Sequence, residues 1–170
     1  MTTFIEGGVT AAKGFQAAGV HCGIRKNRAK KDLGLIVSDR PASAAAVYTR
    51  NLVKGAPLTV TQAHIADGRA RAIVCNSGIA NTCAFDGIEK AEAMCALTAE
   101  ALGIDAADVV VASTGVIGPS IDIAPIAAGL PRLAAALSAQ GSADAAEAIM
   151  TTDTRKKEFA VTFQADGRTC

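Results

Sequence analysis

Two apolar runs in this chain each end in a short polar segment that closes on a glycine. Residues 109–112 are three valines and an alanine, and they lead without a charged residue into Ser-Thr-Gly at 113–115. Residues 71–75 lead in the same way into Asn-Ser-Gly at 76–78. Short apolar runs of this kind predict buried strands. The chain therefore folds around a sheet whose strands deliver hydroxyl groups and glycines at their ends.

These polar segments have two interpretations. Ser, Thr, Asn and Gly are the residues of ordinary turns, and a turn is the more common meaning of each segment taken singly. However, the ends of strands are also where α/β proteins place ligand contacts. At Thr114 and Gly115, a hydroxyl lies beside a residue that has no side chain to block a reacting carbonyl oxygen. The residues alone leave both interpretations open.

Short apolar runs separated by glycines predict an antiparallel or mixed sheet, and apolar residues at helical spacing predict helices. The pairing of Asp86 with Glu89 predicts a capping box at the start of one helix, and Ser142 predicts the N-cap of another. Pro131 follows Gly129 and predicts either two helices or a sharp kink. The expected strands are 14–23, 33–37, 44–48, 71–75, 109–112 and 159–163, and the expected helices are 58–66, 86–102, 122–139 with the break at 129–131, and 143–150.

A hairpin turn is predicted at Asp166 and Gly167, directly after the strand at 159–163. The chain ends at Cys170, so the returning strand is expected to be missing. We expect the polypeptide to continue, or another chain to supply the neighbouring strand. Because the chain contains no linker-like or repetitive segment, we expect a single domain over residues 1–170.

The charge balance excludes several classes of partner. The chain has 17 basic and 16 acidic residues, a net charge of +1, and so lacks the field that holds a polyanion. We interpret the basic run at 25–31 as a solvated loop and expect no nucleic acid. No apolar run reaches the roughly 18 residues of a membrane helix, and the N-terminus has no signal-peptide pattern. We expect no membrane partner and a cytoplasmic location.

The sequence contains no recognisable metal site or nucleophile. Its five cysteines form no Cys-x-x-Cys pair and have no histidine at the spacing of a metal site, so we expect reduced thiols and no metal. Phosphate-binding glycine motifs are absent from the sequence as well. The residues thus provide donors for an oxyanion but no activated nucleophile, which amounts to half of an active site.

Several motifs, in this order and spacing, resemble the ornithine acetyltransferases, also called glutamate N-acetyltransferases, of arginine biosynthesis. Each motif is weak alone, and their combination is specific. The resemblance covers nearly the whole chain. The motifs are VTAAKGF at 9–15, KDL at 31–33, YTRN at 48–51, KGAP at 54–57, NSG at 76–78 with AN at 80–81, STGVIG at 113–118 and AIMTTDT at 148–154.

The resemblance implies a chain that works with a partner. Members of this family cut their precursor before a threonine, which becomes the N-terminal nucleophile of a β chain. This chain would be the α chain. The implied fold class is α+β, a layered αββα sandwich with mixed sheets that both chains complete, assembled as α2β2 or larger.

The same resemblance assigns site residues. Thr114 would stabilise the oxyanion through its hydroxyl and Gly115 through its N–H, while Thr151 would bind substrate, with Thr152 as the alternative. The implied reaction moves acetyl from N-acetylornithine to glutamate by a ping-pong mechanism without a cofactor, with acetyl-CoA left open as a co-substrate. Two rivals remain: a self-processing N-terminal-nucleophile aminopeptidase or hydrolase, and a non-catalytic scaffold subunit.

Overall fold

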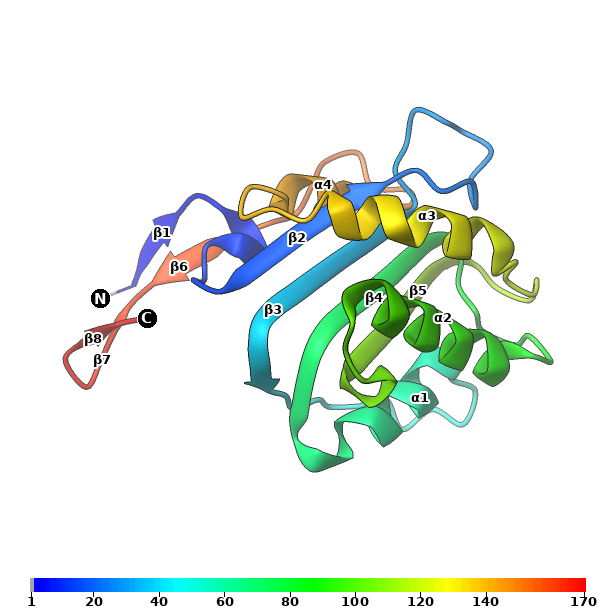
Figure 1. Cartoon of the computed structure of the whole chain (residues 1–170), viewed down its shortest axis with the longest axis horizontal. Helices are drawn as coiled ribbons and strands as arrows, with labels where there is room; N and C mark the ends of the chain where they lie inside the picture. The colour runs from blue at the N-terminus through cyan, green and yellow to red at the C-terminus, as the bar shows by residue number, and fades with distance from the viewer. Residues whose placement is uncertain (1) are drawn as a thin grey trace.

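The computed structural model describes residues 2–170. Its centre is a four-stranded sheet in the order β2-β3-β4-β5, in which β3 is antiparallel to both neighbours and β4 and β5 are parallel (Figure 1). A second ribbon pairs β1 with β6, and β7 pairs with β8. The strands are β1 (Thr3–Ile5), β2 (Phe15–Val20), β3 (Leu33–Ser43), β4 (Arg69–Ile79), β5 (Val109–Val116), β6 (Ala160–Thr162), β7 (Gln164–Ala165) and β8 (Arg168–Thr169), and the α-helices are α1 (Ala56–His64), α2 (Gly87–Leu102), α3 (Ala124–Ala135) and α4 (Ser142–Ala148).

One face of the sheet forms the hydrophobic core against α1, α2 and α3. Alternate residues of a strand point to one face, and on this face they are small aliphatic side chains such as Leu33, Leu35 and Val74, each at most 1% exposed. The helices contribute equally buried side chains. No aromatic side chain belongs to the core among the described residues, so helices and sheet approach closely. The helical side chains are Val60 of α1, Ala91, Met94, Cys95 and Ala99 of α2, and Ile126, Leu130 and Leu133 of α3.

The opposite face of the sheet carries α4, which packs directly on the backbone of β2. A Cβ atom added at Gly19 would lie 2.1 Å from the carbonyl oxygen of Asp144. A side chain there would push the helix off the strand. Farther along the same face, Ile73 of β4 keeps 40% of its surface exposed. The sheet therefore has one buried face and one that α4 covers only in part.

The predicted α+β class with mixed sheets is confirmed, and most predicted strands are present. β4 and β5 are longer than predicted, because both continue through the polar segments that follow their apolar runs. The strand predicted at 44–48 is wrong. β3 pairs with β2 as far as Ser38 and with β4 as far as Ser43, and the chain then leaves the sheet at Ala44, whose N–H donates to the Gly68 carbonyl at 2.8 Å. Val47, 99% exposed, has no strand to pack on.

The predicted helix at 86–102 is confirmed as α2, and Gly103 ends it with φ 65°. The predicted capping box is wrong, because the Asp86 side chain caps no N–H and instead accepts a hydrogen bond from the Ser120 hydroxyl at 2.6 Å. The capping role predicted for Ser142 is also wrong. Ser142 is the first residue of α4, and its hydroxyl donates to Glu158 at 2.7 Å. No helix within residues 2–170 is both long and apolar enough to cross a membrane.

Of the two outcomes predicted for 129–131, two separate helices is wrong, since α3 is one helix that contains Pro131 and ends at Ala135; a kink at Pro131 stays a prediction. An interior proline removes one helical hydrogen bond and costs about 3 kcal/mol. The buried side chains on either side of it, Leu130 and Leu133, pack into the core. This packing holds the helix together across the proline.

The hairpin turn predicted at Asp166 and Gly167 is confirmed, with φ values of 47° and 73°. The expectation that the returning strand is missing is wrong, because β8 returns against β7 within this chain. Backbone hydrogen bonds of 2.9 and 2.8 Å between Phe163 and Cys170 extend the pairing. Asp and Gly both tolerate the left-handed conformation of this turn, so a hairpin with very short strands suffices to close it.

Replacing Gly19 by alanine is predicted to destabilise the protein by about 1–3 kcal/mol, the usual cost of overpacking a close contact. The added methyl would collide with the Asp144 backbone, which has no rotamer to escape. Gly34→Ala is the matched control, since its nearest new neighbour is the Ala148 Cβ at 3.3 Å. Urea unfolding of both variants measures the difference. Equal stability of the two would contradict the packing of α4 on β2.

Candidate active site

The two polar segments lie side by side, because β4 and β5 pair in parallel. In this register Asn76 is opposite Ser113, Ser77 opposite Thr114, and Gly78 opposite Gly115. The sequence indicated that each segment follows a strand but not that the two would be neighbours. The parallel register thus places the two polar segments, 76–78 and 113–115, together at the carboxyl ends of these strands. We call this region the β4–β5 edge.

Both glycines at this edge have backbone conformations that other residues rarely adopt. The φ angle is 110° at Gly78 and 132° at Gly115. A Cβ atom at Gly115 would lie 2.3 Å from the Gly78 carbonyl carbon and 2.8 Å from the Ile79 nitrogen. The two backbones approach so closely that only glycine fits at residue 115.

The alternation of backbone groups along β5 predicts that the N–H of Gly115 lies on the side of the strand away from β4. β5 is an edge strand, and the backbone groups of a strand alternate between its two sides. Val111 lies four residues before Gly115, so its backbone groups face the same side of β5. Its N–H donates to the Thr61 hydroxyl of α1 at 3.4 Å, and its carbonyl accepts from that hydroxyl at 3.1 Å. On the other side, the Val116 carbonyl accepts from Ala80 of the β4 side at 2.9 Å. Gly115 is exposed, so an external acceptor can reach its N–H.

Thr114 is half-buried and lies on the sheet face that carries α4. Directly registered residues of parallel strands share a face, and Ser77, its partner on β4, donates its hydroxyl to the Ala148 carbonyl of α4 at 2.6 Å. The Thr114 hydroxyl and the Gly115 N–H are therefore consecutive donors at one accessible strand end. Donors in this arrangement are suited to stabilising a negative oxygen.

Thr151 follows α4 on the same side of the sheet and is half-buried, whereas Thr152 is exposed. The Thr151 N–H donates to the Asp153 carboxylate at 3.3 Å. The pKa of Asp153 is lowered, chiefly by its hydrogen bond with Lys157 and also by the Thr151 N–H. The roles of Thr114, Gly115 and Thr151 in binding or catalysis stay predictions, as does the choice between Thr151 and Thr152.

Sequence reasoning missed two charged residues beside this edge. Asp32 is fully buried, and its carboxylate accepts backbone N–H groups of the loop between β2 and β3. Arg25, which we interpreted as part of a solvated basic run, is half-buried, and its guanidinium donates to the Met150 carbonyl next to Thr151. Residues 26–30 of that run are exposed as expected. The only signal in the sequence is that Arg25 opens the run, next to the apolar Ile24.

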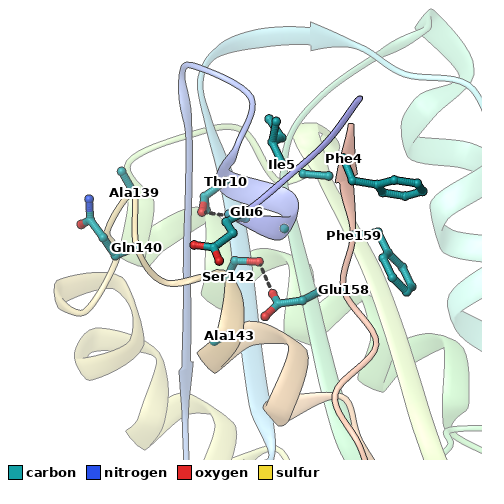
Figure 2. Close-up of a pocket in the computed structure, with 13 residues that line it drawn as sticks. Phe4, Ile5, Glu6, Thr10, Ala139, Gln140, Ser142, Ala143, Glu158 and Phe159 are labelled. Atoms are coloured by element: carbon teal, nitrogen blue, oxygen red, sulfur yellow. Dashed lines mark hydrogen bonds between the residues drawn. The ribbon is translucent and has the colours of Figure 1, made fainter. Parts of the chain in front are cut away.

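A cavity of about 780 Å³ lies at a different place, between the β1–β6 ribbon and the start of α4. Figure 2 shows the Ser142–Glu158 hydrogen bond at its wall and the rings of Phe4 and Phe159 at its side. None of the predicted site residues lines it. Thr114 and Gly115 lie away from this cavity, at the carboxyl end of β5, and the active site predicted there stays a prediction.

The comparisons with known proteins agree with the resemblance seen in the sequence. A family model described as the ArgJ family matches residues 16–170. The arginine biosynthesis bifunctional protein ArgJ of Symbiobacterium thermophilum is 49% identical over 168 residues, which cover 98% of this chain and 42% of that protein. The chain thus spans about two fifths of the length of the curated relatives it matches.

Two solved structures share the fold. The crystal structure of the arginine biosynthesis bifunctional protein ArgJ from Bacillus halodurans has a TM-score of 0.91 at 42% identity and covers 99% of this chain and 89% of that chain. The structure of ornithine acetyltransferase complexed with ornithine from Mycobacterium tuberculosis has a TM-score of 0.86 at 37% identity and covers 95% and 88% of the two chains. The fold is therefore that of acetyltransferases of this type. The chain belongs to the ArgJ family.

Three of the five cysteines have a raised pKa, so they stay protonated at neutral pH. Burial raises the pKa of Cys75 and Cys95 to about 12. Burial, and next the charge of Asp32, raises the pKa of Cys22 to about 12. A thiolate, not a thiol, is the nucleophile, so these three side chains are poor nucleophiles at neutral pH.

Alkylation with iodoacetamide at pH 8 is predicted to modify Cys83 and Cys170, which are exposed, and to leave the three raised thiols unmodified. A thiol with a pKa near 12 is only about 0.01% ionised at that pH, and its reaction rate rises about tenfold per pH unit up to its pKa. Peptide mapping by mass spectrometry reports each position. Rapid modification of Cys22 in the folded protein would contradict this assignment.

Gly115→Ala is predicted to destabilise the protein more than Gly118→Ala does, by at least about 1 kcal/mol. Both glycines have positive φ, 132° and 106°, so both substitutions strain the backbone. Only Gly115 also faces a collision, because nothing lies within 4 Å of a Cβ at Gly118. Denaturant unfolding of both variants gives their free energies of unfolding, and the difference between the two is the cost of the collision. Equal losses would show that the β4 and β5 backbones do not approach as described.

Proposed function

We propose that this chain is the α chain of an N-acetyltransferase that moves the acetyl group of N-acetylornithine to glutamate. Thr114 and Gly115 stabilise the oxyanion, and Thr151 binds substrate. The nucleophile is the N-terminal threonine of a β chain cut from the same precursor. The observation that carries the proposal is the accessible strand end where the Gly115 N–H and the Thr114 hydroxyl are consecutive donors.

The share of each relative that this chain covers supports a two-chain protein. The chain covers 42% of the curated relative from Symbiobacterium thermophilum. In contrast, it covers 89% of the chain in the Bacillus halodurans crystal structure. A solved chain so much nearer this one in length supports a precursor divided into two polypeptides, which assemble as α2β2 or a larger complex.

The first half of the reaction is acylation of the β-chain threonine. Its hydroxyl oxygen attacks the acetyl carbonyl of N-acetylornithine while its free α-amine takes the proton. The carbonyl oxygen becomes negative and accepts hydrogen bonds from the Thr114 hydroxyl and the Gly115 N–H. When the intermediate collapses, the carbon–nitrogen bond breaks and ornithine leaves with the proton. The acetyl group stays on the threonine as an ester.

The second half transfers the acetyl group to glutamate. The amine of glutamate attacks the ester carbonyl, and the same two donors stabilise the second oxyanion. The α-amine takes the proton of the attacking amine and gives it to the threonine oxygen as the carbon–oxygen bond breaks, which frees the threonine and releases N-acetylglutamate. No cofactor takes part, and neither histidine is required because the α-amine is the base.

The proposal extends to a second acetyl donor and to a place in the cell. Curated relatives are named bifunctional, which supports acetyl-CoA as an additional donor for the same acetyl-enzyme. The Mycobacterium tuberculosis ornithine acetyltransferase was solved in complex with ornithine, which supports ornithine as a product here. We place the reaction in the cytoplasm, where these amino acids are available.

Thr114→Ala in the assembled αβ protein is predicted to lower kcat by about 100- to 1000-fold with little change in KM, the usual effect of losing one oxyanion donor. The reason is that the hydroxyl bonds the oxygen only after it becomes charged. Thr114→Ser keeps the hydroxyl and is the matched control, expected to retain most activity. Steady-state assays with N-acetylornithine and glutamate measure both. Normal turnover in Thr114→Ala would favour a scaffold role.

An assay of the αβ protein with N-acetylornithine but without glutamate distinguishes an acetyltransferase from a hydrolase. An acetyltransferase releases ornithine once per active site and then stops, because the acetyl-enzyme has no acceptor. A related N-terminal-nucleophile hydrolase would instead release acetate continuously. Continuous acetate release, unaffected by added glutamate, would overturn the proposed transfer.

A further inference from the structure

The loop between β2 and β3 is held by one buried carboxylate. Asp32 is 0% exposed, and its side chain accepts the backbone N–H groups of Cys22 at 2.6 Å, Gly23 at 3.2 Å and Arg25 at 2.8 Å. His21 adds a contact from its Nδ1 atom at 3.2 Å. A buried carboxylate must be compensated by such donors. Asp32 therefore fixes the backbone path of this loop up to Arg25.

The main chain of Asp32 is tied to the candidate site as well. Its carbonyl accepts the N–H of Ser77 at 2.9 Å, and its own N–H donates to the Val20 carbonyl at 2.9 Å. Ser77 is the register partner of Thr114. The same residue that fixes the loop thus also fixes the strand beside the proposed oxyanion donors.

Ile24 and Arg25, in the first half of this loop, lie against Gly78. A Cβ atom at Gly78 would lie 3.1 Å from the Ile24 Cγ2 atom and 3.2 Å from the Arg25 Cγ atom. The Arg25 side chain therefore starts directly above Gly78, which pairs with Gly115. From that position its guanidinium reaches across to the segment that follows α4.

Two carbonyls, one at the last residue of α4 and one two residues beyond it, accept side-chain hydrogen bonds from the loop and from β4. The Arg25 guanidinium donates to the Met150 carbonyl, and the Ser77 hydroxyl donates to the Ala148 carbonyl at 2.6 Å. The last carbonyls of a helix lack partners within the helix, and a cation there is favourable. Thr151 comes directly after Met150, so the Arg25 bond constrains the residue proposed to bind substrate.

We propose that Arg25, held in place by Asp32, is a positioning residue that sets the place of Thr151 relative to Thr114 and Gly115. This inference rests on the proposed function in one respect, the substrate-binding role of Thr151. Arg25 acts through the Met150 carbonyl and touches no reacting atom. Removing it loosens the 149–153 segment and leaves the oxyanion donors in place.

The test compares three variants of the assembled αβ protein. Arg25→Met keeps the length of the side chain but removes its donors, and Arg25→Lys keeps a cationic donor. Lys26→Met removes the neighbouring exposed cation and is the matched control. Arg25→Met is expected to raise KM for N-acetylornithine about tenfold with kcat within about threefold. Arg25→Lys is expected to recover part of the loss, and Lys26→Met to match the wild type.

Hydrogen exchange followed by mass spectrometry gives a second measurement that needs no activity. The amides of residues 149–153 are expected to exchange at least about tenfold faster in Arg25→Met than in the wild type or Lys26→Met. Unchanged exchange in this segment would overturn the proposal. A fall in kcat with constant KM would also overturn it, since that result places Arg25 with the oxyanion donors.

Acetyl transfer to glutamate tests the proposed function, and hydrogen exchange at residues 149–153 tests the positioning role of Arg25. If the wild-type protein transfers no acetyl group to glutamate, the proposed function fails, while the exchange comparison still decides whether Arg25 positions the segment. If transfer is normal and the exchange rates of the variants are equal, the positioning role alone fails. Asp32→Asn, which keeps the side-chain volume, is expected to show the same faster exchange at 149–153 if it folds.

Discussion

The parallel pairing of β4 with β5 is the constraint on which the rest of this structure depends. It places Gly78 beside Gly115 with a separation that leaves no room for a side chain. Because β5 is the edge strand, the Gly115 N–H then faces outward beside the Thr114 hydroxyl. An antiparallel or shifted pairing would separate these two glycines, and Thr114 would be an ordinary residue near the end of a strand.

In the proposed mechanism this chain supplies the oxyanion donors and the β chain supplies the nucleophile. Oxyanion donors act through being fixed in advance, and here they are built into the sheet that forms the core. A threonine whose own α-amine is its base must begin a polypeptide, and in the proposed mechanism that polypeptide is the β chain. The close contact of α4 with Gly19 brings the helix end and Thr151 onto the same face as Thr114. Arg25 and Ser77 then join that helix end to the sheet.

Local patterns in the sequence predicted much of the fold but not its pairings. The apolar stripe and the terminal Gly103 were sufficient for α2, and short apolar runs were sufficient for the main strands, because these signals depend on near neighbours in the chain. The register of β4 with β5 depends on residues far apart, so the contact of Gly78 with Gly115 was not predictable. The role of Arg25 was hidden for the same reason, since a run of cations indicates solvent unless the Met150 carbonyl is known to lie nearby. The assignment of Thr114, Gly115 and Thr151 came from the family resemblance.

The most direct test of this account is the carbonyl stretching frequency of the acetyl group in the acetyl-enzyme, measured by isotope-edited infrared difference spectroscopy. Two hydrogen bonds to the carbonyl oxygen polarise the bond and lower its frequency. The account predicts a band below that of a simple acetyl ester in the wild type and an upward shift when the Thr114 hydroxyl is removed. A band at the same frequency in both proteins would show that the carbonyl oxygen does not lie at this strand end, and would contradict the account.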